Sequence, residues 1–384
     1  MRSFHYYNPT RVYFGPEIEK NLQEELLKQK AKKVLLITME YAEQLGIEAD
    51  VKAACASVGA ALLIERDVLP NPQVEPVRAL QKMCREEGVD LLIAAGGGSV
   101  IDTAKSVAVA ACSEADPWSY FEGAPVEKTL PVLCIPTIAA SGSETSNAAI
   151  LSNGVYKRGM ESDLIYPVAA FLNPAYTSTL PWFQTAAGLA DISSHLMERY
   201  FSNDPAADVT DRQIEGALRS LLVQSGRLLE NPKDLDARGE VQWLALIAHN
   251  NSMDAGREAC WGSHRIEHEL SGIYHLTHGE GMAVVFVAWC RYMSEVKPKK
   301  LAQLADRVFG IDAWSFDEKT AALRLADTLE QFYRKLGLRT RLKEFKIDES
   351  RFREMGERAT ENGSVGHYVP LDADRIVEIL KLAL

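Results

Sequence analysis

One stretch predicts how the first half of the chain folds: Asp90-Leu-Leu-Ile-Ala-Ala-Gly96-Gly97-Gly98-Ser99-Val-Ile-Asp102-Thr-Ala-Lys105. Its apolar residues 90–95 are typical of a buried strand, and a triple-glycine turn leads from them directly into a helix. Further buried strands are expected at 33–38 and 131–136, with helices between them. This alternation predicts a parallel, doubly wound sheet, in which ligands bind beyond the carboxyl ends of the strands.

The three glycines favour a phosphate-binding turn. One glycine is usually enough for a tight strand-to-helix turn, whereas three let the backbone approach a pyrophosphate at the free N–H groups of the helix start. The motif is not G-x-G-x-x-G, so the usual acidic partner of the ribose cannot be read from it. The loop 137–144, after strand 131–136, is rich in hydroxyl groups and either holds a nicotinamide or ribose or only caps a turn.

Two local structures are also predicted in this half. Phe4–Tyr7 and Arg11–Phe14 are expected to form a hairpin around the turn at residues 8–10. Two more strands are expected at 147–151 and 167–172, with Lys157 in a solvated turn between them.

From Pro181 onward the apolar residues recur with the helical period of 3.6. We therefore expect an α/β domain at residues 1–178 that binds a dinucleotide, and a helical domain at residues 179–384 that binds a metal.

The helical half carries two pairs of side chains with metal-ligand spacing. Asp191 and His195 are four residues apart, as are His264 and His268, and His278 follows across a bend that contains glycine. Residues four apart share one face of a helix, so two such pairs on facing helices would form a four-point metal site. The alternative is that these imidazoles are satisfied core or surface groups, which we favour only for His275.

The segment His264-Arg-Ile-Glu267-His268 also matches H-x-x-E-H, the signature of inverted zinc peptidases. That interpretation leaves Asp191, His195 and the triple glycine without a role, so it ranks lower.

Charge and cysteine content exclude several classes of partner. The net charge is −11, which makes nucleic acid and anionic membrane surfaces poor partners. No segment is apolar for long enough to span a bilayer. Six scattered cysteines without a C-x-x-C motif indicate reduced thiols, as in the cytoplasm.

Taken together, these features resemble the iron-containing (group III) alcohol dehydrogenases over nearly the whole chain. The stretch from His264 to Ser271, followed by His278-Gly-Glu-Gly-Met-Ala, is most similar to the butanol dehydrogenase and aldehyde reductase branch. The other motifs that carry the resemblance are Asn8-Pro9-Thr10, Phe14-Gly15, Pro70-Asn71-Pro72, Gly96–Ser99 with Asp102 and Lys105, Pro136-Thr137 with Gly142-Ser143-Glu144, Lys157-Arg-Gly and Asp191-x-x-x-His195.

The resemblance implies a dehydroquinate-synthase-like fold of the class α/β plus all-α, with an N-terminal Rossmann-like parallel-sheet domain and a C-terminal helical domain. It implies one divalent ion, Fe²⁺ first with Zn²⁺ or Ni²⁺ as alternatives, on Asp191, His195, His264 and His278, and a catalytic histidine at His268. It implies contacts to a nicotinamide dinucleotide at Met39, Asn71, Gly96, Gly97, Gly98, Ser99, Asp102, Thr137, Ser141, Ser146 and Lys157.

The expected activity is hydride transfer between NADP(H) or NAD(H) and a small primary alcohol or aldehyde, by a cytoplasmic homodimer that binds neither nucleic acid nor membrane. Met39 stands where family members that prefer NAD often carry Asp, which favours NADP(H), although Glu40 adjoins it. His275 stands where the branch often has an acidic residue. A relative of glycerol dehydrogenase or dehydroquinate synthase is the nearer alternative, and the zinc peptidase the remote one.

Overall fold

The computed structural model describes residues 1–68, 71–204, 206–312 and 315–384. It divides into two compact units: residues 7–180 with 233–250, and residues 1–6 with 181–232 and 251–384. Pro70 of the expected Pro70-Asn71-Pro72 turn lies outside the described residues. The folding domains expected at 1–178 and 179–384 stay a prediction.

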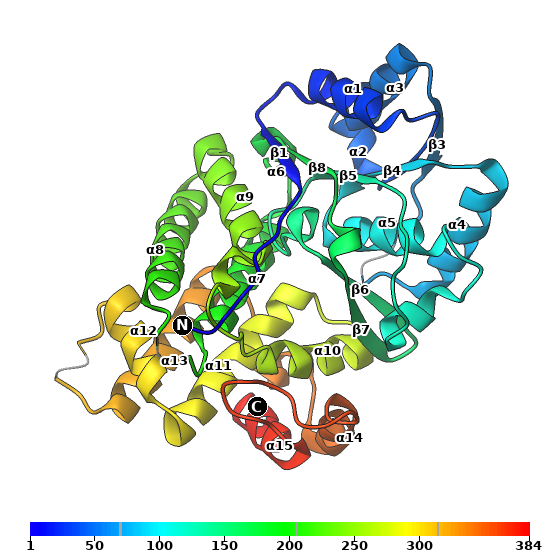
Figure 1. Cartoon of the computed structure of the whole chain (residues 1–384). Coiled ribbons are helices and arrows are strands. Elements are labelled where there is room, and N and C mark those ends of the chain that lie inside the picture. The colour runs from blue at the N-terminus through cyan, green and yellow to red at the C-terminus, as the bar shows by residue number, and fades with distance from the viewer. Residues whose placement is uncertain (69–70, 205, 313–314) are drawn as a thin grey trace. The chain divides into compact units, whose positions relative to one another are not determined.

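The first unit is built on a six-stranded parallel sheet with the strand order β1-β8-β5-β4-β2-β3 (Figure 1). Its strands are β1 Arg11–Phe14, β2 Lys33–Ile37, β3 Ala61–Glu65, β4 Leu91–Gly96, β5 Val132–Pro136 and β8 Ala169–Leu172. Its helices are α1 Ile18–Gln29, α2 Tyr41–Gln44, α3 Ile47–Val58, α4 Val74–Glu87, α5 Gly98–Ala110, α6 Pro174–Thr177 and α9 Leu235–His249.

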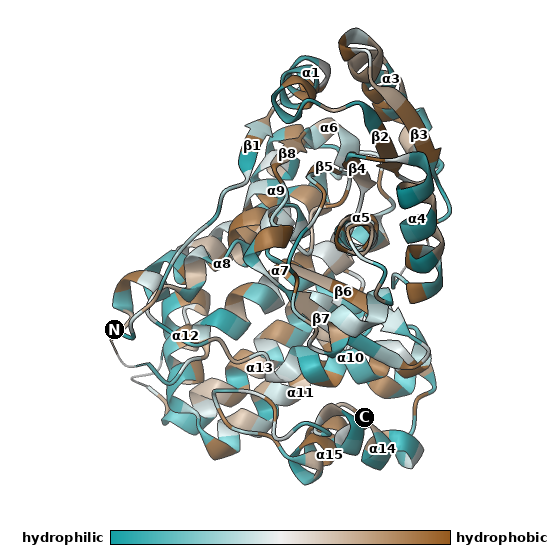
Figure 2. Cartoon of the chain, turned by 45° about the vertical axis from the view of Figure 1, so that its right-hand side comes forward, coloured by the Kyte–Doolittle hydropathy of each residue, from teal (hydrophilic) through white to brown (hydrophobic). Residues whose placement is uncertain are grey.

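Both faces of the sheet are buried because its strands are apolar on both sides. Leu35 and Ile37 of β2 pack in one cluster with α4 and α5, and Val34 and Leu36 pack in another with α1 and α3. Figure 2 shows hydrophilic and hydrophobic patches along α4, as expected of a helix that buries one face. The parallel sheet predicted from the sequence is confirmed.

The expected N-terminal hairpin is wrong. Residues 4–7 form no strand, and β1 pairs in parallel with β8 instead. The turn at residues 8–10 is fixed by the side chain of Asn8, whose Nδ2 donates to the backbone oxygens of Thr145, at 2.8 Å, and Asn250, at 3.2 Å. These bonds satisfy the turn without a partner strand on its N-terminal side.

The prediction that Lys157 lies in a solvated turn is also wrong. It lies in β7 (Tyr156–Glu161), which pairs antiparallel with β6 (Ala148–Asn153), and the turn between these strands is at residues 154–155. Lys157 is buried, not solvated. The prediction failed because only Lys157 and Met160 of β7 are buried, and the charged residues of this short strand hide its apolar pattern.

The second unit is helical, as predicted, and its central helix α11 packs against α7, α10, α13 and α15. Residues 282–290 of α11 are buried on all sides. The helices are α7 Trp182–Tyr200, α8 Asp208–Glu230, α10 Gly262–Tyr274, α11 His278–Val296, α12 Lys299–Phe309, α13 Glu318–Lys335, α14 Phe352–Ala359 and α15 Ala373–Leu382.

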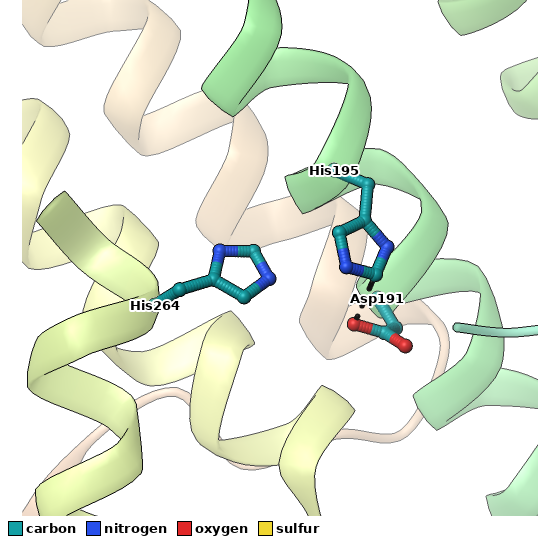
Figure 3. A group of neighbouring side chains, drawn as sticks. All are labelled: Asp191, His195 and His264. Carbon is teal, nitrogen blue, oxygen red and sulfur yellow. Dashed lines mark ion pairs between the residues drawn. The ribbon is translucent and has the colours of Figure 1, made fainter. Parts of the chain in front are cut away.

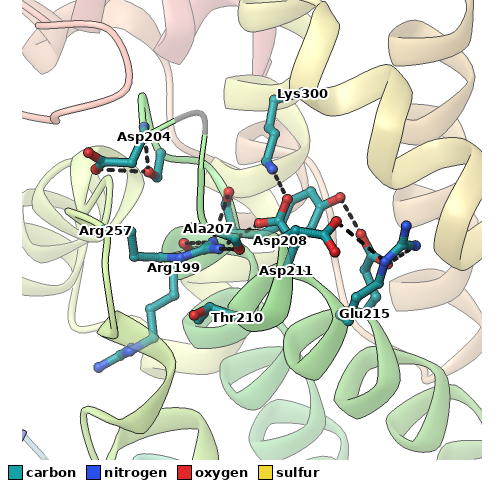
Figure 4. Close-up of polar contacts among 12 residues, drawn as sticks. Arg199, Asp204, Ala207, Asp208, Thr210, Asp211, Glu215, Arg257 and Lys300 are labelled. Carbon is teal, nitrogen blue, oxygen red and sulfur yellow. Dashed lines mark hydrogen bonds and ion pairs between the residues drawn. The ribbon is translucent and has the colours of Figure 1, made fainter. Parts of the chain in front are cut away.

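Buried ion pairs join α8 to its neighbours in this unit (Figure 4). Asp211 of α8 lies 2.6 Å from Nη2 of Arg257 and also pairs with Lys300 of α12. Glu215, one turn further on, pairs with Arg307 at 3.0 Å. Within the described residues, no helix combines the length and apolar character needed to cross a bilayer. All six cysteines are free thiols.

Candidate metal centre and nucleotide-binding edge

Three helices of the second unit carry the predicted metal ligands. Asp191 and His195 lie in the middle of α7, His264 lies in the first turn of α10, and His278 begins α11. Asp191, His195 and His264 are buried, and the His278 side chain is 26% exposed.

Three of these four side chains form one close group, and His278 adjoins that group through Asp191. The candidate ligand atoms of Asp191, His195 and His264 all lie within 4.8 Å of one another (Figure 3). Oδ1 of Asp191 is 3.8 Å from Nδ1 of His195 and 3.5 Å from Nε2 of His278. A tetrahedral ion with ligands at about 2.1 Å would separate ligand pairs by about 3.4 Å. The separations of Asp191 from His195 and from His278 are therefore close to what one small ion requires.

The donor set fits a divalent cation. One carboxylate and three imidazoles can bind Fe²⁺, Zn²⁺ or Ni²⁺, and the ligand types alone do not select one of them. Nε2 of His264 is buried and has no hydrogen-bond partner among residues 1–68, 71–204, 206–312 and 315–384. A buried imidazole nitrogen without a partner is costly unless a ligand completes it.

A buried carboxylate, Glu198, stands behind His264. Its Oε1 accepts hydrogen bonds from the backbone N–H groups of Ser263 and His264, at 3.0 and 3.1 Å, and from the Ser263 hydroxyl group, and it lies 3.2 Å from Nδ1 of His264. Burial raises the pKa of Glu198, but the hydrogen bonds from His264 and Ser263 outweigh it, so its pKa lies below the usual value. The ionised carboxylate directs the other ring nitrogen, Nε2, away from itself.

Glu267 supports His278 in the same way. Its Oε2 is bonded to Nδ1 of His278, and its Oε1 accepts from the hydroxyl group of Ser271. The residue is fully buried. Neither glutamate was predicted to support a ligand, although both lie three residues after a predicted ligand, in His195-x-x-Glu198 and His264-x-x-Glu267.

His268 adjoins His278, with ring centroids 5.8 Å apart. The candidate ligand atoms of Glu267, His268 and His278 form a second close group, separate from that of His264 with the α7 pair. This grouping disfavours a zinc peptidase, because both carboxylate oxygens of Glu267, its expected base, are engaged in hydrogen bonds. His275 is exposed at the end of α10, which agrees with a surface role.

Close packing and an ion pair fix the start of α11, and with it His278. A Cβ atom on Gly279 would lie 2.0 Å from the backbone oxygen of Ala187 in α7, so only glycine allows this approach. Both carboxylate oxygens of Glu280 accept hydrogen bonds from Arg339, at 3.0 and 2.8 Å from Nε and Nη2.

In the first unit, the triple-glycine turn joins β4 to α5. No side chain caps the first turn of α5, and a Cβ on Gly98 would lie 2.6 Å from Oγ of Ser141. Uncapped N–H groups at a helix start suit an anion such as a pyrophosphate. The residues therefore fit the predicted nucleotide.

The neighbouring strands β2, β4 and β5 bring several predicted contacts to the same edge of the sheet. Met39 follows β2 and is half-buried. Thr137 follows β5, and its hydroxyl group is 2.5 Å from that of Tyr41. The backbone oxygen of Ser141 is 2.6 Å from Nδ1 of His249 in α9.

A buried network holds Asp102 and Ser146. The carboxylate of Asp102 accepts from the hydroxyl group of Ser143 at 2.6 Å and from the N–H of Ile150 at 3.2 Å. Nζ of Lys105 donates to the backbone oxygens of Ser143, Ser146 and Ala148 at 2.6 to 2.8 Å. Burial raises the pKa of Asp102 and lowers that of Lys105. The network ties α5 to the segment 143–150.

The last two predicted contacts lie beside Ser152 of β6. Lys157 is paired with Ser152 in the sheet register. The N–H of Ser152 donates to the backbone oxygen of Pro72, the residue after Asn71, at 2.8 Å. Asn71 has a left-handed backbone with φ of 53°. The structure thus gathers Met39, the glycine turn, Thr137 and Ser141 at the strand ends. It places Lys157 in β7 and Asn71 in the segment before α4 that is bonded to β6.

The fold is that of a known class of oxidoreductase. Residues 9–174 match the family described as iron-containing alcohol dehydrogenase, and residues 185–384 match the C-terminal part of the Fe-containing alcohol dehydrogenase family. The chain belongs to this family, as the resemblance predicted.

Particular relatives cover the whole chain. It is 34% identical to NADH-dependent butanol dehydrogenase B of Clostridium acetobutylicum, over 99% of both chains. It is 31% identical to the NADPH-dependent aldehyde reductase YqhD of Escherichia coli, over 98% of both. A crystal structure titled NADH-dependent butanol dehydrogenase A from Thermotoga maritima aligns with a TM-score of 0.95 and 31% identity, over 100% of this chain and 99% of its own. The protein is therefore an enzyme of the alcohol and aldehyde oxidoreductase class.

Proposed function

We propose that the protein is a metal-dependent, NAD(P)(H)-linked alcohol dehydrogenase or aldehyde reductase that acts on a small primary alcohol or aldehyde. The observation that carries the proposal is the close group of Asp191, His195 and His264, with His278 at 3.5 Å from Asp191. A buried glutamate stands behind each of His264 and His278. The relatives named for butanol and for aldehyde support the substrate class.

Asp191, His195, His264 and His278 would hold one divalent ion, with Fe²⁺ as the first candidate and Zn²⁺ or Ni²⁺ as alternatives. A bound ion would supply a Lewis acid for the substrate oxygen. Glu198 and Glu267 each hold Nδ1 of a ligand imidazole, which fixes the ring and leaves Nε2 for the ion.

His268 is proposed as the proton relay. Its imidazole is buried beside that of His278. An imidazole titrates near neutral pH, so it can accept the hydroxyl proton of an alcohol and pass it toward solvent, or return it to a reduced aldehyde.

The nucleotide is proposed to bind at the strand ends around Gly96–Ser99. Met39 has no charge that would repel a 2′-phosphate, so we propose NADP(H), with NAD(H) as the alternative. The relatives include one named for NADH and one named for NADPH, so they favour neither. The homodimer and the cytoplasmic location stay predictions of the sequence.

Metal analysis of protein prepared anaerobically, with a screen of aldehydes against NADH and NADPH, tests the proposal. Stoichiometric metal and reduction of unbranched aldehydes are expected. A protein that binds no divalent metal, or that is active only on glycerol, would refute it.

The role of His268 has its own test. His268→Ala should keep the metal and lose about 10²- to 10⁴-fold in turnover, the usual contribution of general acid–base catalysis. The matched control is His275→Ala, since His275 is exposed. Metal loss from His268→Ala would contradict the assigned role, because His268 would then be a ligand.

A further inference from the structure

Trp261 adopts a backbone conformation that is rare for a large side chain. It has φ of 57° and ψ of 8°, in the left-handed region, immediately before the first residue of α10. Residues of this size occur there only where the surroundings enforce it, and such positions cluster at functional sites.

Two backbone hydrogen bonds hold the residue before Trp261 in place. The N–H of Cys260 donates to the backbone oxygen of Glu198 at 2.9 Å, and its own oxygen accepts from the N–H of His367 at 3.0 Å. The chain enters Trp261 from a fixed position, and His264 follows one helical turn later. The left-handed backbone of Trp261 thus sets the direction in which its indole leaves the start of α10.

The indole contacts two of the proposed metal ligands. Its ring centroid is 5.1 Å from that of His264, at an interplanar angle of 75°, and 6.1 Å from that of His195, at 64°. The two imidazoles are stacked on each other, with centroids 4.9 Å apart. Edge contacts with both rings restrict their rotation, since aromatic pairs have preferred geometries.

A buried arginine holds the indole in turn. Cζ of Arg199 lies over the ring at 4.6 Å, in cation–π geometry. The guanidinium group also bonds to Oδ2 of Asp254 at 3.2 Å, and Nη1 donates to the backbone oxygen of His195 at 3.4 Å. Arg199 therefore connects the indole to the same turn of α7 that carries a ligand.

We propose that Trp261 is a positioning residue of the metal centre, whose indole holds the imidazole planes of His195 and His264 so that both face one cation. The inference rests on the proposed function. Glu198 orients the imidazole of His264 alone, whereas Trp261 would orient the imidazoles of both His195 and His264.

Three substitutions separate the effect of the indole ring from the effect of the strained backbone. Trp261→Ala removes the ring and keeps the strain, Trp261→Asn removes the ring but tolerates the left-handed conformation, and Trp261→Phe keeps an aromatic ring. Trp243→Phe is the matched control, because Trp243 is 46% exposed on α9. The full-length chain is stripped with a chelator and titrated with Co²⁺ and Zn²⁺.

Trp261→Ala and Trp261→Asn should each weaken Zn²⁺ binding about 10- to 100-fold, the usual effect of losing a group that orients a metal ligand. Both should change the visible Co²⁺ spectrum, which reports ligand geometry. Trp261→Phe should restore most of the affinity, and Trp243→Phe should match the wild type. Wild-type affinity and an unchanged Co²⁺ spectrum in the Ala and Asn variants would overturn the proposal.

A fluorine label gives a second readout, which does not require Trp261 to be replaced by a small residue. In protein containing 5-fluorotryptophan, the resonance missing from Trp261→Phe belongs to residue 261. It should shift as Zn²⁺ binds, and a resonance that does not move would overturn the proposal. Wild-type protein that binds neither metal would instead refute the proposed function, so the two failures are distinguishable.

Discussion

Replacing Gly279 with alanine should displace His278 and so disrupt the metal centre. The Cβ of Gly279→Ala would lie 2.0 Å from the backbone oxygen of Ala187, and real Cβ atoms essentially never approach a heavy atom closer than 3.0 Å. Because the obstacle is backbone, no side-chain rotation relieves it, and α11 must move away from α7 by at least about 1 Å. His278 precedes Gly279, so it moves as well, whereas a working site tolerates displacements of only about 0.5 Å.

The expected result is a loss of one ligand contact. Zn²⁺ affinity, measured by competition with a chelating dye, should fall by about 100-fold or more, at or beyond the upper end of what loss of a supporting contact costs. Thermal unfolding should show a loss of about 1–3 kcal/mol, as is usual for overpacking.

Gly216→Ala is the matched control for this substitution. Gly216 is an exposed residue of α8, and its added Cβ would meet no atom within 4 Å. Because alanine favours helix more than glycine, this variant should be slightly more stable than wild type. Wild-type Zn²⁺ affinity in Gly279→Ala would refute the packing argument, since α11 would then have accommodated the methyl group without moving His278.

Three further predictions concern the nucleotide edge and pH. Lys105→Met should cost about 3–5 kcal/mol in chemical unfolding, as breaking a buried charge network does, and should weaken NADPH binding in a fluorescence titration. Met39→Asp should disfavour NADPH, because a new charge about 4 Å from a doubly charged phosphate costs about 2 kcal/mol in water, or ~30-fold in KM. Burial raises the pKa of Glu330, but hydrogen bonds from Arg341 and Arg291 bring it down to about 2. The folded-state pKa lies below the unfolded one, so this stabilisation is fully present above about pH 4.5 and is lost as the pH falls through about 2, at about 1.4 kcal/mol per pKa unit. The unfolding midpoints of wild type and Glu330→Gln should therefore differ most at pH 7, differ less at pH 3 and converge only near pH 2.

Each of these predictions has an outcome that would contradict it. A Lys105→Met protein of normal stability would mean that the Asp102 network adapts without the ammonium group. If Met39→Asp raised the KM for NADH and the KM for NADPH equally, residue 39 would not face the 2′ position of the nucleotide. A constant difference between wild type and Glu330→Gln from pH 7 to pH 2 would show that the carboxylate does not titrate in this range.

The sequence predicted those features that depend on local periodicity. Runs of apolar residues indicated the strands β2, β4 and β5, because strands buried on both faces are apolar throughout. The spacing of four residues indicated that Asp191 lies near His195, since both project from one helix face. Local patterns were sufficient in these cases because each structure lies within a single element.

Features that depend on tertiary pairing escaped the sequence analysis. The residues of β1 have the same local pattern whether they pair with residues 4–7 or with β8, and the bonds of Asn8 to distant backbone oxygens exclude the hairpin. In the same way, α9 follows α8 along the chain but belongs to the unit that contains the sheet. Nothing in its own periodicity distinguishes the two surroundings.

The two supporting glutamates show how a local spacing acquires meaning only from packing. At 3.6 residues per turn, side chains three positions apart differ by about 60° around a helix axis. When the imidazole of such a pair faces the centre of a bundle, the carboxylate faces the adjacent helix. Glu198 of α7 therefore meets His264 of α10, and Glu267 of α10 meets His278 of α11. Asp191 of α7 also lies 3.5 Å from His278. The ligands on α10 and α11 therefore each depend on a carboxylate of another helix, and displacing α7 or α10 disturbs a ligand that lies outside the displaced helix.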